Sequence, residues 1–108
     1  MTMNMSIDQK KKLQTLEIQR AELFKNAIET AKVVLTLGTP YAFEIIYRKF
    51  MEYEAVEKKL GEWVEKYSII SAMFLMKNPK DIYFKLDPAT QALWDAVPEL
   101  AAWRRKFR

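Results

Sequence analysis

Cationic side chains near the C-terminus offer the clearest chemistry in this chain, because aromatic rings bracket them. The cluster consists of Trp103, Arg104, Arg105, Lys106, Phe107 and Arg108. Cations of this kind can bind phosphate groups or an acidic partner, while a neighbouring ring stacks on a base. Basic residues in a last helical turn also complement the helix dipole and stay solvated. Both interpretations of the tail, a nucleic-acid contact and a solvated helix end, stay open.

A second basic group near the N-terminus could extend this surface. It consists of Lys10, Lys11 and Lys12, and it is flanked by Asp8 and Glu17. Because Asp8 is spaced to pair with Lys12 along a helix, a solvated face is the stronger interpretation of the triplet alone. The chain has 18 basic and 14 acidic side chains, which gives a formal net charge of +4. The four cations of the tail account for that excess, so the rest of the chain is neutral.

Catalytic chemistry has few residues to use. The chain contains no Cys and no His, which excludes disulfides, thiol nucleophiles, imidazole bases and the commonest metal ligands. Several glutamates each lie near a Lys or on an expected outer helix face: Glu52, Glu54, Glu57, Glu62 and Glu65. The two isolated glycines, Gly38 and Gly61, cannot make a phosphate-binding loop. We therefore predict a non-enzymatic protein with no catalytic residue, no cofactor and no metal.

Aromatic and methionine side chains are the candidates for contact with a partner protein. Most aromatic residues follow the spacing of a core, but three lie off the main apolar stripe or at its edge: Tyr41, Tyr47 and Trp63. Tyr and Trp are enriched in the hot spots of interfaces. Met73 and Met76 could form an adaptable apolar surface that docks a partner helix. Core packing is the alternative use of these residues.

A first long helix is predicted over residues 6–37. Ser6 and Gln9 match a capping box, whereas residues 1–5 carry no periodic signal and should be flexible. Apolar residues then recur in steps of three and four, and Arg20 is the one charged occupant of that row. Gly38 can close the helix in the left-handed conformation.

A second helical region is predicted over residues 39–77, antiparallel to the first. Thr39 can cap it, and Pro40 suits its first helical position. The apolar period continues across Gly61, so either one long helix or two helices are possible. We expect a break or bend at Gly61, because an unbroken helix would outreach its partner and need a second subunit to cover its end. This choice bears on whether the chain forms a homodimer.

The remaining residues should close one end of the hairpin. Pro79 ends the second region, and residues 82–86 should form a crossing loop with apolar anchors. Asp87 caps the first of the short helices expected within residues 87–107, and Pro98 starts or kinks the last one. At 108 residues the chain is a single domain. The predicted class is all-α, a small antiparallel helical bundle built on a long helical hairpin with short C-terminal helices.

The sequence shows no leader pattern and no apolar run long enough to span a bilayer, so we expect a soluble, cytoplasmic protein. The leading prediction of function is a protein–protein interaction module, such as an adaptor, inhibitor or assembly factor. It would bind another protein through an exposed helical face, and we expect it to be a homodimer. The alternative is a nucleic-acid-binding protein that uses the basic aromatic tail.

Overall fold

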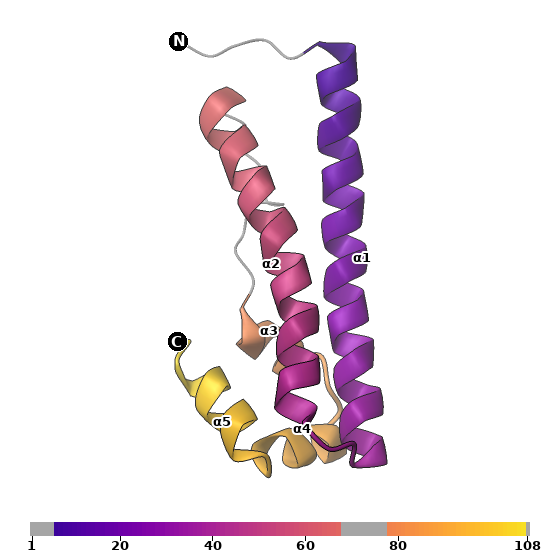
Figure 1. The fold of residues 1–108 in the computed structure, drawn as a ribbon, viewed down its shortest axis with the longest axis vertical. Coiled ribbons are helices and arrows are strands. Elements are labelled where there is room, and N and C mark those ends of the chain that lie inside the picture. The colour runs from indigo at the N-terminus through magenta and orange to yellow at the C-terminus, as the bar shows by residue number, and fades with distance from the viewer. Residues whose placement is uncertain (1–5, 68–77, 108) are drawn as a thin grey trace.

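The computed structural model describes residues 6–67 and 78–107, and these residues form only helices and the turns between them (Figure 1). The helices are α1 (Ile7–Leu37), α2 (Ala42–Tyr67), α3 (Pro79–Phe84), α4 (Pro88–Asp95) and α5 (Pro98–Arg105). α1 and α2 pack antiparallel as a hairpin, and the three short helices gather around one end of it. The predicted all-α class, with a long hairpin and short C-terminal helices, is confirmed.

Both ends of α1 form as the sequence predicts. Ser6 donates its backbone N–H to Gln9 Oε1 at 2.8 Å, and Gln9 donates its own N–H to Ser6 Oγ at 3.2 Å, which completes the capping box. At the other end Gly38 adopts a φ of 64°. The Gly38 and Thr39 amides then donate to the carbonyls of Leu35 and Val34 at 3.2 and 3.0 Å. This Schellman pairing satisfies two carbonyls that the helix end would leave unpaired.

The predicted start of the second helix is wrong by two residues. α2 begins at Ala42 rather than at Pro40, and its first intrahelical bond runs from the Ile45 amide to the Tyr41 carbonyl at 3.1 Å. Thr39 donates its amide N–H to the Val34 carbonyl as part of the closure of α1, and the chain then turns over Pro40 and Tyr41 before α2 begins. Tyr41 takes a φ of 60° there, an unfavourable value for a residue with a side chain.

The expected break at Gly61 is also absent, because α2 continues as one helix to Tyr67. A methyl group added at Gly61 would meet no atom within 4 Å, so no close approach requires a glycine at this position. Its cost is only the helix propensity of glycine, about 1 kcal/mol relative to alanine. The buried Leu60 and the neighbouring Trp63 pack in one cluster with residues of α1, which outweighs that cost.

From the sequence we expect an unbroken second helix to extend beyond the first and to need a second subunit to cover its end. The described helices do not show this mismatch in length. α1 extends beside the whole of α2, since Gln9 in its first turn contacts Tyr67, the last residue of α2. The predicted continuation of the second helical region over residues 68–77, and the flexible residues 1–5, lie outside the described residues.

The loop predicted over residues 82–86 is wrong in its first half, where α3 forms instead. Asn78 caps this helix by accepting from the Lys80 amide at 2.9 Å, and the Asn78 amide donates to Asp81 Oδ2 at 2.7 Å. Pro79 occupies the first helical position. The same four residues that resemble a turn therefore form a capping box. Two short helices follow as predicted, one capped by Asp87 and one that starts at Pro98.

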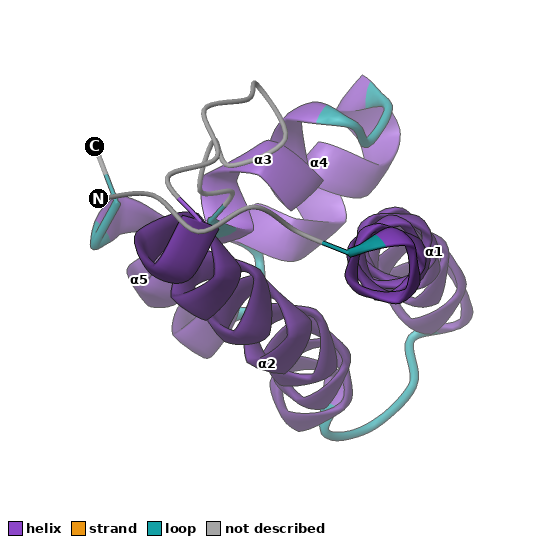
Figure 2. Cartoon of the chain, turned by 90° about the horizontal axis from the view of Figure 1, so that it is seen from above, coloured by secondary structure: helices purple, strands orange, loops and turns teal. Residues whose placement is uncertain are grey.

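The hydrophobic core is divided unequally along the hairpin. We call the half next to Gly38 the turn end, and the half that contains Gln9 and Tyr67 the open end. At the turn end thirteen buried residues form one cluster that includes Ile46, Trp94 and Leu100, each with 0% exposure. Here α3, α4 and α5 add a further layer to α1 and α2 (Figure 2). At the open end, counting the described residues alone, a separate cluster has three buried members, which are Leu13, Val56 and Leu60.

Candidate binding surface at the open end

The aromatic residue of the basic tail, Trp103, lies in the core rather than on the surface. Its side chain is only 8% exposed. Its ring packs edge-on against Phe43 and Phe50 of α2, at centroid distances of 5.8 and 5.3 Å, and stacks on Trp94 of α4 at 6.2 Å. A nucleic-acid base could not stack on this ring without unpacking the turn end.

Arg104 of the tail joins α5 to α3 and α4. Its Nη2 donates to Asp95 Oδ1 at 3.0 Å, and its guanidinium lies 4.0 Å from the centroid of the Tyr83 ring. The Tyr83 hydroxyl donates to Asp95 Oδ2 at 2.8 Å, and this hydrogen bond to a carboxylate raises the pKa of Tyr83 above its ordinary value. The guanidinium of Arg104 is therefore engaged within the fold.

The other tail cations are more accessible. Arg105 is exposed although its Nε donates to the Ala101 carbonyl at 3.2 Å, and Lys106 is exposed. Arg108 lies outside the described residues.

The N-terminal lysines do not extend the tail surface. Lys10, Lys11 and Lys12 are exposed in the first turns of α1, at the open end, whereas α5 lies beside the turn end (Figure 1). The molecule is 49 Å long and 24 by 21 Å across. The two basic groups therefore face different ends of a long molecule, and the idea that they form one continuous surface is wrong.

The aromatic interface candidates separate in the same way. Tyr41 is 77% exposed in the hairpin turn, near the exposed Leu37. Tyr47 is 40% exposed, and its ring packs on Trp103 at 5.5 Å, so it covers the turn-end core. Trp63 is partly buried at the open end. Met73 and Met76 lie outside the described residues.

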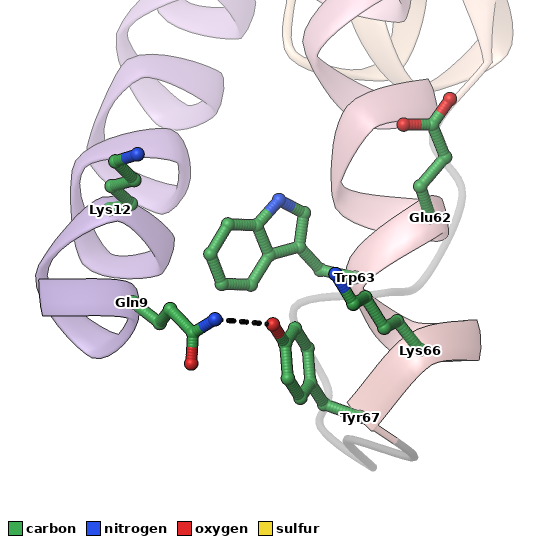
Figure 3. A pocket seen from close by; sticks show the side chains of 6 residues that line it. All are labelled: Gln9, Lys12, Glu62, Trp63, Lys66 and Tyr67. Carbon is green, nitrogen blue, oxygen red and sulfur yellow. Dashed lines mark hydrogen bonds between the residues drawn. The ribbon is translucent and has the colours of Figure 1, made fainter. Parts of the chain in front are cut away.

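Trp63 lies between the two helices of the open end and lines a hollow of about 330 Å³ (Figure 3). Its ring packs on Tyr67, one helical turn further along α2, with the centroids 5.3 Å apart. The Tyr67 hydroxyl accepts a hydrogen bond of 2.7 Å from Gln9 Nε2, which ties the tip of α1 to the end of α2. Lys66 Nζ lies 5.5 Å from the centroid of the Tyr67 ring, a cation–π distance.

A second hollow of about 410 Å³ lies against Trp63 and is lined mainly by residues of α1. Leu16 and Trp63 give it an apolar surface, while Lys11, Lys12 and Thr15 complete its lining. Lys12 and Trp63 line both hollows, so the two are adjoining parts of one surface. We call it the open-end surface, and it comprises Gln9, Lys11, Lys12, Thr15, Leu16, Glu62, Trp63, Lys66 and Tyr67.

The structure thus joins residues that the sequence places in separate groups. Lys12 is a predicted phosphate or acidic-partner contact and Trp63 a predicted protein contact, and they meet across the hairpin. Gln9 is recognisable in the sequence only as a helix cap, yet its side chain also reaches α2. Thr15 and Leu16 follow Lys11 and Lys12 by one helical turn, and this i, i+4 spacing is the signal that could have placed all four on one face.

A buried ion pair separates the open end from the turn end. Arg20 Nη1 lies 3.6 Å from Glu57 Oε1, and the two side chains are only 13% and 7% exposed. Of the two positions expected for the glutamates, near a Lys or on an outer helix face, Glu57 is therefore not on the outer face; its side chain is buried against Arg20. Within the described residues, Arg20 Nη1 and Glu57 Oε2 have no hydrogen-bond partner. The pair crosses the helix interface, and a one-turn slip of α1 against α2 would separate two buried charges.

Neither a metal site nor a membrane span is found in the described part of the chain. Residues 6–67 and 78–107 contain no group of three or more acidic side chains placed to hold a metal ion. None of their helices combines the length and the apolar character needed to cross a bilayer. Comparison of the chain with protein-family models, curated proteins and solved structures finds no match.

Proposed function

We propose that this chain is a non-enzymatic protein–protein interaction module, an adaptor, inhibitor or assembly factor, that binds its partner through the open-end surface. The observation that carries the proposal is the position of Trp63, a partly buried indole that lines two adjoining hollows between exposed lysines. Tryptophan is one of the residue types enriched in interface hot spots, which cluster in well-packed pockets. The hollows, of about 330 and 410 Å³, lie at the lower end of the volume range of small-molecule pockets, which leaves room for one side chain of a partner.

The partner we propose is a different polypeptide rather than a second copy. In a two-fold dimer built on the open-end surface, the same patch would meet itself, and its described lining carries three lysines, Lys11, Lys12 and Lys66, against one acid, Glu62. Like charges opposed across an interface cost several kcal/mol. Light scattering on the purified chain should therefore give the mass of a monomer, and a stable dimer that Lys12→Glu strengthens would show instead that the second copy is the partner.

Selection of a random peptide library on the immobilised full chain tests the proposal. We expect selected peptides to lose about 30-fold in affinity for Trp63→Ala, the loss typical of a hot-spot side chain. Thr15→Trp, which fills the second hollow from an exposed position without adding a charge, should weaken the same peptides. The matched control is Leu37→Ser at the turn end, where the leucine is 74% exposed, and it should leave binding unchanged. No binding peptides, or peptides sensitive only to Leu37→Ser, would contradict the proposal.

The nucleic-acid alternative has less support from the geometry. Trp103 is buried, Arg104 is engaged with Asp95, and the N-terminal lysines lie at the other end of the molecule. If the tail does bind nucleic acid, removal of residues 104–108 abolishes a salt-sensitive oligonucleotide complex. Under our proposal that deletion leaves peptide binding intact.

A further inference from the structure

The charged residues that line the second hollow of the open-end surface are all cationic among the described residues. Leu16 and Trp63 provide its apolar wall, and Lys11 and Lys12 are the charged groups beside it. Among the described residues that line this hollow there is no carboxylate. The first hollow adds one more lysine and one glutamate, Lys66 and Glu62, so cations exceed acids on the combined surface.

We infer that the partner presents an acidic segment with one large apolar side chain, which enters the hollow against Leu16 and Trp63 while flanking carboxylates meet Lys11 and Lys12. This inference rests on the proposed function and adds the chemistry of the partner to it. A buried apolar anchor supplies most of the affinity of such contacts, and complementary charges around it supply orientation and a faster association rate.

The cations beside the hollow are lysines rather than arginines, and lysines suit carboxylates that approach in more than one geometry. Lys11 and Lys12 are exposed lysines on one helical turn, and a lysine ammonium is a mobile point charge that does not require the bidentate fit of an arginine. Proteins that bind a single-stranded nucleic acid commonly offer open ring faces on which successive bases stack. Trp63 is instead partly buried, with Tyr67 packed on it, and it forms the wall of a hollow.

The amino-acid composition of peptides selected on the full chain tests this inference separately from the proposed function. We expect enrichment of Asp and Glu on both sides of one Leu, Phe or Trp. The double substitution Lys11→Glu and Lys12→Glu should weaken these peptides on the order of tenfold. Selection repeated on that variant should enrich Lys and Arg instead. The matched control is Lys25→Glu with Lys32→Glu, two exposed lysines further along α1 that give the same change of charge.

Each outcome has a defined meaning. Peptides that depend on Trp63 but carry no acidic bias, or that tolerate the Lys11 and Lys12 reversal, overturn the acidic segment and leave the interaction module standing. Peptides that ignore Trp63 overturn both proposals. A third outcome is that no peptide is selected but a fluorescent single-stranded oligo-dT binds the full chain. If the double variant Lys11→Glu with Lys12→Glu no longer binds that oligonucleotide, the surface binds nucleic acid and both proposals are overturned.

Discussion

The turn end and the open end of the hairpin are built from the same two helices but packed to different depths. At the turn end three short helices add a further layer, and thirteen buried residues form one cluster. At the open end, within the described residues, the buried cluster has three members, all of them on α1 and α2. Among the described residues, Trp63 at the open end is partly exposed, whereas Trp94 at the turn end is 0% exposed. We propose that the turn end carries most of the stability and that the open end is the binding surface.

The largest loss of stability is expected from Trp94→Ala at the turn end. The indole is fully buried, and its Nε1 donates to the Leu100 carbonyl at 3.1 Å. Removing it leaves a cavity and an unpaired carbonyl, so unfolding in urea should show a loss of about 4 kcal/mol. A loss below about 1 kcal/mol would show that the turn end does not carry the stability.

A smaller loss is expected at the boundary between the two ends. Arg20→Met leaves Glu57 buried without its cation and should destabilise the chain by about 3 kcal/mol. The double variant Arg20→Met with Glu57→Leu should recover most of that loss, because no buried charge remains. Urea denaturation of the three proteins measures both effects, and equal losses in the single and double variants would mean that packing rather than charge explains them.

At the open end Leu13→Ala should cost about 2 kcal/mol, at the lower limit for a buried leucine. The side chain is 8% exposed in a small cluster, and the space that it leaves can fill with water from the open end. Leu100→Ala, at a fully buried turn-end position, is the matched control and should cost about 4 kcal/mol. If Leu13→Ala lowered the free energy of unfolding more than Leu100→Ala, the open end rather than the turn end would carry most of the stability.

The smallest effect concerns the ionisation of Tyr83 at the turn end. Its hydrogen bond to Asp95 favours the neutral phenol and raises the pKa of Tyr83 in the folded chain. The stability from this bond is therefore complete below the unfolded-state pKa of about 10, and it is lost as the pH rises through the folded-state pKa. Phenolate absorbance of the native chain minus that of Tyr83→Phe should show the raised pKa. Asp95→Asn should lower it, and an unchanged titration would refute the link.

The sequence predicts most of the fold because its strongest signals are local. A capping box at Ser6, a left-handed glycine at Gly38 and a cap at Asp87 each depend on a few neighbouring residues. The errors occur where packing decides between two local possibilities. Gly61 stays helical because Leu60 and Trp63 pack against α1. Residues 78–81 form a capping box where turn chemistry is the equally consistent interpretation.

The candidate surface was less accessible to prediction than the fold, because its parts come from opposite ends of the hairpin sequence. Lys12 and Trp63 are each recognisable as a candidate, but only the register between α1 and α2 brings them to one pair of hollows. The same holds for Trp103, whose position beside arginines suggests a surface ring. Its burial depends on four aromatic partners, three from α2 and one from α4.

The most direct test is hydrogen–deuterium exchange on the full chain, with and without its tightest selected peptide. It shows whether the peptide binds at the open end and leaves the turn end, to which we assign the stability of the fold, unchanged. Our account predicts that the peptide slows exchange in residues 9–16 and 60–67, and that this protection is lost with Thr15→Trp, which fills the second hollow without adding a charge. Slower exchange confined to residues 33–41 or 98–107 would contradict it, because binding would then use the end that we assign to stability.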